Sequence, residues 1–375
     1  MIRVSQAQAA HFILQKNHLT TPAPNLTELL TALGGIPAEP STTPPLAAGL
    51  RLAGFKATDL SALHRERSLI RGMLMRGQPH VVLTETFATY FAATARQRKQ
   101  QLNSEFRLWD IENEEIEQVG RRIVTLIGDE PLSQAVIEER LPAAMRRDLK
   151  QTSRGGRVST TTNVAQALRW LTATGILYAA EMAGADSPVY GPLAHWYPDL
   201  DLTALPTEAS AQEAVVRTYL AAFGPASEAD VSFWTGFGKS ETARAITSLS
   251  AETTLTLVEG IPGMTLLLKN QAQALQEIDP PAQAVVKLLP ANDPFTIAHR
   301  ASRTRYFNNQ RLQRQVFSSS GAARPAVVCD GKIVGTWDVG DEISIAIEWL
   351  AEVDGEVKAK AEAEAEILVK EIGLT

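Results

Sequence analysis

The spacing of apolar residues in the first third of the chain predicts four helices, separated by polar or proline-rich breaks. The expected helices span residues 6–17, 26–34, 59–65 and 84–98. Ser5 and Thr84 are the expected N-caps of the first and last of these helices. Residues 36–45 contain four prolines and are expected to form a loop, because proline cannot donate a backbone hydrogen bond. The apolar run Val81-Val82-Leu83 predicts a strand.

Downstream of an acidic stretch at residues 105–117, which indicates a boundary, one order of elements occurs twice. Three helices are followed each time by two short strands. The first copy has helices at 116–127, 131–141 and 162–174, and strands at 176–180 and 189–190. The second copy has helices at 213–223, 227–234 and 239–249, and strands at 253–258 and 264–268, with Ser227 as the expected N-cap of its second helix. This is the order of a winged helix, whose third helix normally enters the major groove of DNA.

The last third of the chain changes character and predicts a small, mostly β domain. Its expected strands lie at residues 285–289, 326–329, 332–337 and 343–347. Asp330-Gly331 is typical of a type I′ turn between two of these strands. The Ala-, Glu- and Lys-rich run at residues 358–370 predicts a solvated terminal helix.

These elements predict an α+β fold in which tandem winged-helix modules precede the β domain. A chain of 375 residues is long enough for several domains, which typically hold roughly 100–200 residues each. We expect an N-terminal winged-helix-like domain, a second and a third winged helix, a C-terminal β domain and an acidic helical tail, at residues 1–115, 116–205, 206–275, 276–350 and 351–375.

The charge is unevenly distributed, which changes the meaning of a net charge of −6. Residues 338–366 hold ten acids and two lysines, or −8, and the rest of the chain therefore carries −6 − (−8) = +2. Residues 294–329 contain six arginines and no acid, with Tyr306 and Phe307 among them. A second basic cluster, in the loop before the helix at 162–174, comprises Arg146, Arg147, Lys150, Arg154 and Arg157. Such local basic stretches are compatible with nucleic acid as a partner.

Cysteine content and hydropathy narrow the expected compartment. Cys329 is the only cysteine and cannot form an internal disulfide, as expected in a reducing cytoplasm. Residues 1–10 lack the apolar core of a signal peptide, and no apolar run reaches the ~18 residues that a membrane span needs. We therefore expect a cytoplasmic, nucleoid-associated protein with no membrane partner.

Several enzyme motifs are missing from the sequence. Gly236-Phe237-Gly238-Lys239-Ser240 resembles the end of a phosphate loop, but Phe233 stands where that loop needs glycine. We interpret the segment as the turn of a helix-turn-helix. The six histidines have no metal-binding spacing, and there is no GxSxG motif. Neither a metal nor another cofactor is expected.

Polar residues on or before the helix at 162–174 are candidates for DNA contacts, because hydroxyls, amides and arginines suit phosphates and base edges. The acid-free stretch adds further arginines that suit a phosphate backbone. The candidate residues are Arg154, Arg157, Thr160, Thr162, Asn163, Gln166, Arg169, Arg300, Arg303 and Arg305. The alternative interpretation is that they are ordinary helix caps, surface residues and a solvated loop.

Four segments resemble, in order and spacing, motifs of one family of winged-helix DNA-binding proteins. Residues 74–80 (LMRGQPH) resemble LMRGTLH, and residues 219–226 (YLAAFGPA), followed by Asp230 and Trp234, resemble YLAAYGPAT–D–WW. Residues 288–295 (LLPANDPF) resemble LLPAFDPY, and residues 324–337 resemble RPVVLVDGRVVGTW. This family includes the AlkZ and YcaQ DNA glycosylases, and the resemblance runs from about Leu33 to Trp337. Asp293 and Trp337 are the structural residues expected in these motifs.

The resemblance implies tandem winged helices and a C-terminal β-barrel around a DNA channel, and metal-free excision of alkylated bases, including crosslinked or bulky adducts. It also implies a GGLQAQ segment in which Gln-x-Gln or Gln-x-Asp positions the hydrolytic water and stabilises the departing nucleoside. The matching segment is Gly34-Gly35-Ile36-Pro37-Ala38-Glu39, so Pro37 and Glu39 occupy the two positions. Proline cannot orient a water, whereas Glu39 can act as a base or oppose an oxocarbenium-like sugar. Arg76 and His80 are expected to line the cleft.

We therefore expect a monomer that binds double-stranded DNA, including damaged DNA, and excises bases poorly or not at all. The first alternative is an active N-glycosylase of base excision repair, in which Glu39 activates water. The second alternative is a winged-helix transcriptional regulator, although regulators usually dimerise on palindromic sites.

Overall fold

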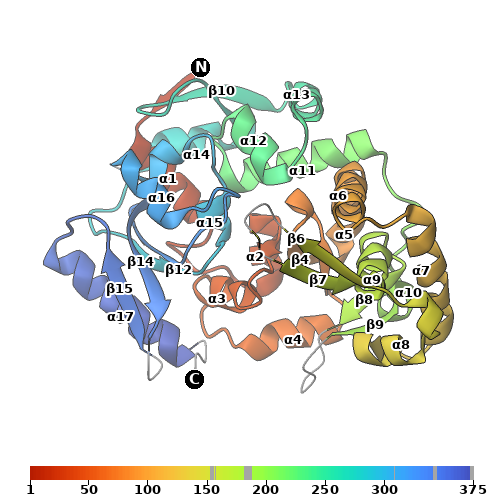
Figure 1. The fold of residues 1–375 in the computed structure, drawn as a ribbon. Helices are drawn as coiled ribbons and strands as arrows, with labels where there is room; N and C mark the ends of the chain where they lie inside the picture. The colour runs from red at the N-terminus through yellow and green to blue at the C-terminus, as the bar shows by residue number, and fades with distance from the viewer. Residues whose placement is uncertain (153–155, 157, 181–187, 308, 341–343, 372–375) are drawn as a thin grey trace. The chain divides into compact units, whose positions relative to one another are not determined.

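The structure is a computed structural model that describes residues 1–152, 156, 158–180, 188–307, 309–340 and 344–371, with mixed α and β elements (Figure 1). Its Cα positions form two compact units, Met1–Thr94 with Pro206–Thr375, and Ala95–Leu205. The five segments expected from the sequence are a finer division and stay a prediction. Within the described residues, no helix combines the length and the apolar character that a bilayer span requires.

The first unit contains a repeat that begins with α2 (Leu26–Leu33), whose N-cap Asn25 accepts a hydrogen bond from the Glu28 backbone N–H. The repeat continues with β2 (Ile36–Pro37), α3 (Thr43–Gly49), α4 (Ala57–Arg65), β3 (Leu69–Met73) and β4 (Pro79–Leu83). The strands form a sheet of order β2-β4-β3. The predicted loop at residues 36–45 is wrong in part. Pro37 lies in β2, and α3 carries its prolines in the first turn, where the missing N–H has no helical partner to lose.

A second repeat of the first unit lies after residue 206. It comprises α11 (Glu208–Phe223), α12 (Glu228–Thr235), α13 (Lys239–Ser248), β10 (Thr253–Val258) and β11 (Thr265–Leu268). Ser227 caps α12 as predicted, through a reciprocal capping box with Asp230. Between α11 and α12, Ala226 forms a β-bridge with Leu266 of β11. The N-terminal strand β1 (Ile2–Val4) extends this sheet by pairing in parallel with β10.

The second unit contains the remaining repeat and an inserted hairpin. Its elements are α6 (Ala95–Leu108), α7 (Asn113–Ile127), β5 (Leu132–Ser133), α8 (Gln134–Arg140), β6 (Asp148–Thr152), β7 (Val158–Thr162), α9 (Asn163–Ala173), β8 (Leu177–Ala180) and β9 (Val189–Pro192). The acidic stretch at residues 105–117, expected as a boundary, comprises the end of α6, the link between the helices and the start of α7. The basic stretch expected as a loop pairs instead as the antiparallel hairpin β6–β7. Thr162 caps α9 by accepting from the Ala165 backbone N–H.

One topology is common to the three repeats. In each, a short strand or bridge follows the first helix and pairs with the second strand of the closing hairpin. The pairings are β2 with β4, β5 with β9, and Ala226 with Leu266 of β11. The described chain therefore contains three times the order of helix, short strand, two helices and hairpin.

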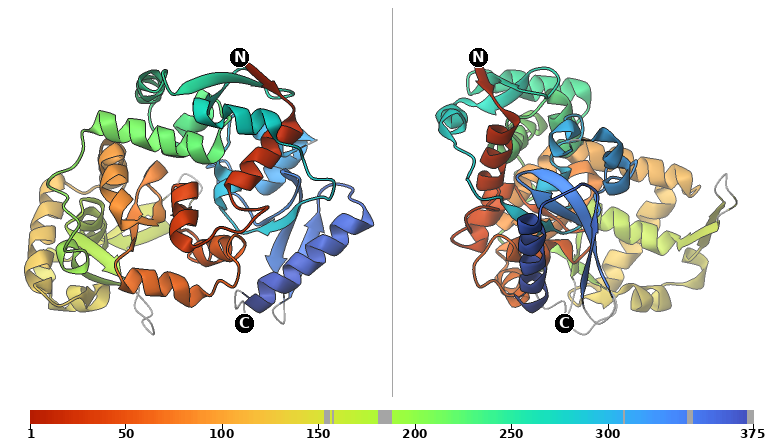
Figure 2. Two further views of the ribbon diagram at one scale, coloured as in Figure 1. Left: turned by 180° about the vertical axis from the view of Figure 1, so that it is seen from behind. Right: turned by 90° about the vertical axis from the view of Figure 1, so that its left-hand side faces the viewer.

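The C-terminal strands β12 (Val286–Leu289), β13 (Ala326–Cys329), β14 (Lys332–Val339) and β15 (Ile345–Trp349) form one antiparallel sheet in that order. Asp330 and Gly331 have φ values of 47° and 80°, as the predicted type I′ turn requires. The helix α17 (Gly355–Glu371) lies along this sheet (Figure 2) and buries Val357, Ala361 and Leu368 against it. The predicted terminal helix is therefore confirmed, but the expectation that it is solvated is wrong for the face that packs on the sheet. The barrel is not confirmed, because the described pairings leave β12 and β15 as edge strands.

Shorter elements complete the two units. The first unit also contains α1 (Gln6–Lys16), α5 (Thr84–Ala93), α14 (Ala272–Glu277), α15 (Pro294–Ile297), α16 (Gln313–Val316), η1 (Met75–Gly77), η3 (Lys269–Gln271), η4 (Arg303–Tyr306) and η5 (Gln310–Leu312). The second unit also contains η2 (Ala143–Met145) and α10 (Leu193–Trp196). Ser5 caps α1 as predicted. The helix expected at 84–98 is interrupted at Thr94, and Thr84 is its first residue rather than its cap.

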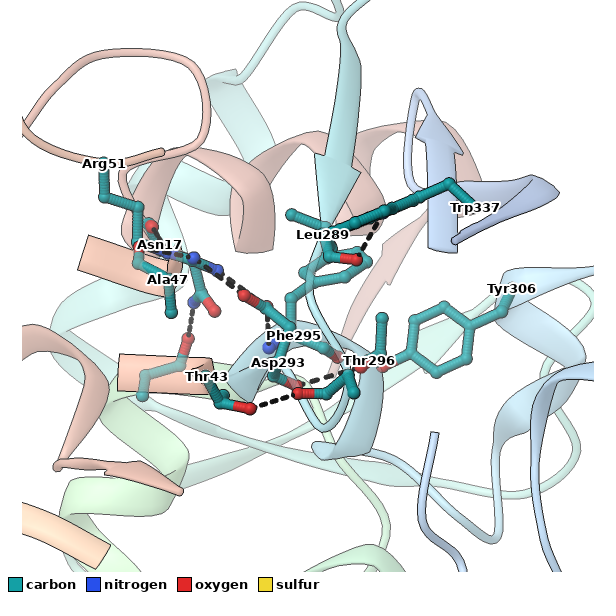
Figure 3. Close-up of polar contacts among 12 residues, drawn as sticks. Asn17, Thr43, Ala47, Arg51, Leu289, Asp293, Phe295, Thr296, Tyr306 and Trp337 are labelled. Carbon is teal, nitrogen blue, oxygen red and sulfur yellow. Dashed lines mark hydrogen bonds and ion pairs between the residues drawn. The ribbon is translucent and has the colours of Figure 1, made fainter. Parts of the chain in front are cut away.

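A fully buried ion pair joins the first repeat to the C-terminal part of the first unit (Figure 3). Arg51 Nη1 and Nη2 lie 2.9 and 2.8 Å from the two carboxylate oxygens of Asp293, and both side chains are 0% exposed. Arg51 also donates to the backbone oxygens of Asn17 and Ala47, at 2.8 and 3.0 Å. Asp293 in turn accepts from the Phe295 backbone N–H at 2.9 Å, at the start of α15. Both buried charges therefore have matched hydrogen-bond partners.

Removing one partner of this pair should strongly destabilise the protein. Asp293→Asn leaves the Arg51 charge buried without a counter-ion, so we expect the free energy of unfolding to fall by about 3–5 kcal/mol. Denaturant unfolding would measure the loss. Glu252→Gln removes one exposed partner of Arg217, whose charges solvent screens, and should change the stability far less. A loss at Asp293 no larger than that of this control would contradict the prediction.

Candidate functional site

The segment that matches the expected catalytic motif forms the edge of the first sheet. Pro37 in β2 lies opposite His80 in β4, and the backbone N–H of Ala38 donates to the Pro79 oxygen at 2.8 Å. Pro37 is buried, whereas Glu39 is exposed at the end of the strand. Among the described residues, the Glu39 carboxylate has neither a hydrogen-bond partner nor an ion pair. It is the one acidic group of the segment, and Pro37 supplies no polar side-chain group beside it.

Asn292 holds the main chain of Glu39 in place. Its Nδ2 donates to the Glu39 backbone oxygen at 2.8 Å, and its Oδ1 accepts from the Ala323 backbone N–H at 2.8 Å. The Asn292 backbone N–H also donates to the Ala323 oxygen at 3.1 Å. Asn292 has a φ of 53°, which asparagine tolerates better than most residues. One amide side chain thus connects the motif segment to the chain near residue 323.

His80 is buried beneath this segment and is not available to a ligand in the described conformation. Its Nδ1 lies 3.0 Å from the Gln78 backbone oxygen, which can only accept, so Nδ1 carries the proton. Burial lowers the pKa of His80 to about 4, the Arg76 charge acts in the same direction, and the bond to Gln78 opposes both. The imidazole is therefore neutral near pH 7.

Arg76, Arg300 and Arg303 converge on one loop of the first unit. Their Nη2 atoms donate to three consecutive backbone oxygens: Arg300 to Ser319 at 3.2 Å, Arg76 to Ser320 at 3.1 Å and Arg303 to Gly321 at 3.3 Å. Arg300 and Arg303, together with Arg76 from a distant part of the sequence, therefore fix the loop at residues 319–321.

An aromatic ring from α12 lies at the centre of this cluster. The Cζ atoms of Arg76 and Arg300 lie 4.2 and 5.0 Å from the centroid of Phe233. A Cβ added to Gly321 would lie 2.6 Å from Phe233 Cζ, so only glycine lets the loop approach the ring this closely. Arg303 is buried against another ring, with its Cζ 3.6 Å from the centroid of Phe317.

The cluster concentrates positive charge on one loop. Arg76 and Arg300 form no ion pair with any acid in the part of the chain that the structure describes. Burial lowers the pKa of Arg76, and the Arg300 charge lowers it further. Burial also lowers the pKa of Arg303 to about 10; Arg300 and Arg76 act in the same direction, whereas Tyr306 and Asp230 oppose them. Arg303 therefore remains charged near pH 7.

Arg303 and Arg305, expected at a DNA-contacting surface, are both buried. Arg305 Nη2 donates to the Pro225 backbone oxygen at 3.1 Å and so contributes to packing between chain segments. Nearby, fully buried Asp230 accepts from the Ser302 backbone N–H and hydroxyl, at 3.1 and 2.6 Å. Burial lowers the pKa of His299 to about 3, so this buried network holds a neutral imidazole. These residues order the segment that presents Arg300.

The two residues expected to be structural are buried and hydrogen-bonded. Asp293 pairs with Arg51 as described above. Trp337 Nε1 donates to the Leu289 backbone oxygen at 2.9 Å, across the C-terminal sheet (Figure 3).

The candidates of the second unit have different surroundings. Thr160 is exposed on β7, whereas Thr162 donates to Glu138 at 2.9 Å. Asn163 and Gln166 are buried, and Asn163 donates to Glu115 at 2.9 Å. Arg169 forms an ion pair with Glu105 at 2.6 Å. In the described conformation only Thr160 of this set presents a free side chain to solvent. Arg154 and Arg157 lie outside the described residues.

Two residues of the candidate site could not be predicted from the sequence. Phe233 is absent from the expected site residues, yet its ring packs against the Arg76 and Arg300 side chains and the Gly321 backbone. Asn292 was part of a matched motif. Its hydrogen bonds reach Glu39, 253 positions before it, and Ala323, 31 positions after it, and local sequence spacing cannot predict such contacts. Within the described chain, no three His, Cys, Asp or Glu side chains gather as a possible metal site.

The family model described as "DNA glycosylase AlkZ-like" matches residues 30–368. Among solved structures, the Streptomyces sahachiroi DNA glycosylase AlkZ is similar, with a TM-score of 0.80 over 99% of this chain and 98% of that chain. The two sequences are 19% identical, so this likeness shows the fold. The comparison with curated proteins gave no match.

Asn292→Gly should test the anchoring of the Glu39 segment. Glycine accepts the positive φ at this position, so the substitution removes the side-chain hydrogen bonds without adding backbone strain. We expect the free energy of unfolding to fall by about 1–2 kcal/mol in a urea titration. Arg67→Gly is the matched control, because Arg67 is exposed and has a φ of 62°. A control variant that loses as much stability as Asn292→Gly would argue against the anchor.

Proposed function

We propose, from the premise that this chain belongs to the AlkZ-like DNA glycosylase family, that it binds double-stranded DNA and has little capacity to excise bases. The observation that carries DNA binding is the pair of arginines, Arg76 and Arg300, gathered on Phe233 with no acidic partner in the described chain. A protein that concentrates unpaired guanidinium groups attracts polyanions, and a duplex presents a phosphate every few ångströms.

We infer that each of the three repeats is a winged helix. The recurring pairing of a short strand with the closing hairpin supports this assignment, as does the helix order. On this assignment α4, α9 and α13 are the third helices of their modules, the position from which such modules usually read the major groove. Three modules in one chain supply several DNA contacts without dimerisation. We therefore expect a monomer that acts on DNA in the cytoplasm, associated with the nucleoid.

Reduced excision rests on the geometry of the motif segment. Pro37 fills the first of the two expected positions with a side chain that neither donates nor accepts, and it is buried in a paired strand. Water activation then depends on Glu39 alone. A single positioned acid or base typically contributes a 10²–10⁴-fold acceleration. Without a polar side chain at position 37, we expect a correspondingly large reduction in the excision rate.

The second candidate function is a working N-glycosylase for alkylated or crosslinked bases. The exposed, unpartnered carboxylate of Glu39 on a main chain anchored by Asn292 favours it. A carboxylate in that position can take a proton from water or stabilise a positively charged sugar. Alkylated purines already have a weakened glycosidic bond, so a partial apparatus can suffice for them.

DNA binding should depend on the basic stretch between α8 and α9. We expect the double variant Arg154→Gln with Arg157→Gln to bind a duplex more weakly. The slope of log Kobs against log salt should become shallower by about 2, because each lost phosphate contact contributes ~0.9. Fluorescence anisotropy across a salt series measures both quantities. The control Arg121→Gln with Arg122→Gln removes the same charge from an exposed face of α7. Equal effects of the two double variants would contradict a local contact.

Excision should respond to the two motif positions in opposite directions. Pro37→Gln restores an amide at the first position, and we expect it to raise the rate of methylpurine release from duplex DNA by about tenfold or more. Glu39→Ala should abolish the residual release, because it removes the remaining polar group of the motif. The assay is single-turnover release from alkylated DNA. Fast release by the wild type, unchanged in Glu39→Ala, would contradict both the reduced activity and the role of Glu39.

A further inference from the structure

We infer that Arg76, Arg300 and the serine loop Ser318-Ser319-Ser320 form a phosphate clamp, which binds one phosphodiester of the DNA backbone. This inference rests on the proposed function and deepens it, because it names the chemical group that one part of the surface recognises. The phosphate clamp lies entirely within the first unit.

The loop of the phosphate clamp is fixed before any ligand arrives. Arg300, Arg76 and Arg303 bind its three consecutive backbone oxygens. The loop also closes on itself, since the Gly321 N–H donates to the Ser318 oxygen at 3.0 Å and the Ser318 N–H donates to the Ala322 oxygen at 2.9 Å. A loop held at this many points loses little conformational entropy on binding a ligand.

The two outer guanidinium groups are positioned but far from saturated. Arg76 and Arg300 each make one hydrogen bond in the described chain, through Nη2, whereas a guanidinium has five N–H donors. Packing on Phe233 fixes the planar groups without using those donors. Arg76 is held with a φ of 58°, an uncommon backbone conformation for arginine. Most of their donors therefore remain for a ligand.

The positive charge of the phosphate clamp favours binding of an anion. Arg76 and Arg300 pack on the same ring and repel each other, and neither has an acidic partner among residues with described side chains. Burial lowers the pKa of Arg76, and the Arg300 charge adds to this shift. An oxyanion placed against both groups would replace this repulsion with charge-assisted hydrogen bonds, which are about twice as strong as neutral ones.

The surrounding groups favour phosphate over a base edge. Phe233 already packs against two guanidinium groups and the Gly321 backbone, so its ring is not free to stack on a base. Ser318, Ser319 and Ser320 are exposed, and serine hydroxyls beside arginine are typical of contacts to phosphate oxygens. Recognition of a phosphodiester in this way is independent of DNA sequence.

The test compares Arg300→Gln with Arg3→Gln, which removes an equally exposed positive charge from β1 of the same unit. We expect Arg300→Gln to bind a duplex about tenfold more weakly and to flatten the salt slope by about 1. Arg3→Gln should stay within about twofold of the wild type. Arg300→Lys keeps the charge but loses the planar fork, so it should retain the slope and lose part of the affinity. Thermal melting of each variant checks that the fold is intact.

A scan with single methylphosphonate linkages identifies the phosphodiester. One neutral linkage should weaken binding by the wild type and cause a smaller loss in Arg300→Gln, because both changes remove the Arg300 contact and only the Arg76 contact is left. The phosphate clamp alone would be overturned if the losses of affinity caused by a neutral linkage and by Arg300→Gln were additive at every linkage. It would also be overturned if Arg300→Gln and Arg3→Gln bound the duplex with equal affinity. Competition by inorganic phosphate at constant ionic strength, with no sensitive linkage, would overturn DNA as the source of the phosphate. A wild type that binds no duplex at low salt would overturn the proposed function itself.

Discussion

The first unit is organised around the buried pair of Arg51 and Asp293. Each of these charges would cost several kcal/mol of desolvation alone, and the bidentate geometry offsets that cost only when both partners are present. The pair therefore requires the end of α3 and the start of α15 to meet, although 242 positions separate them in sequence. Arg51 also binds the Asn17 backbone oxygen, and Asn17 Nδ2 donates to the Ala222 oxygen at 2.9 Å. Hydrogen bonds thus connect the N-terminal helix, the first repeat and α11 to the buried pair of Arg51 and Asp293.

The candidate site depends on this ion pair through the residue that precedes Asp293. Because Asp293 is immobilised, Asn292 can reach both Glu39 and Ala323 with one amide. Ala323 lies two residues after the loop that three arginines hold. The motif segment and the phosphate clamp are therefore joined by a short path of hydrogen bonds, which rigidly supports two chemically different sites. Preorganisation of this kind lowers the entropic cost of binding a flexible polyanion.

Much of the fold followed from local sequence signals, because those signals have local causes. Ser5 and Ser227 cap helices as expected, and Asp330-Gly331 forms the expected turn, since a side chain or a positive φ decides each case within a few residues. Longer-range features could not be predicted in this way. A two-residue strand such as β2 has no periodicity, and α17 reads as solvated because its few apolar residues are outnumbered by charges.

Burial of the arginines in the acid-free stretch, residues 294–329, also could not be predicted from the local sequence. Charge along the sequence correctly marked residues 294–329 as unusual, but it could not separate exposed Arg300 from buried Arg303 and Arg305. That distinction depends on Phe317 and Pro225, which approach these arginines only in the folded chain. Thr160 and Asn163 differ for a similar reason, since one lies on an exposed strand and the other is bonded to Glu115.

Pro37 is compatible with the fold, and it is the residue on which the proposed loss of excision rests. A proline usually disrupts a sheet by removing a donor, but here the bond from β2 toward β4 comes from the Ala38 N–H, and β2 is an edge strand. The sheet therefore accepts proline without a lost hydrogen bond. The segment keeps its anchor at Asn292 and the exposed carboxylate of Glu39, and Pro37 adds no polar side-chain group to it. The fold tolerates proline at this position, so the proposed DNA binding and the proposed loss of excision rest on different residues of the chain.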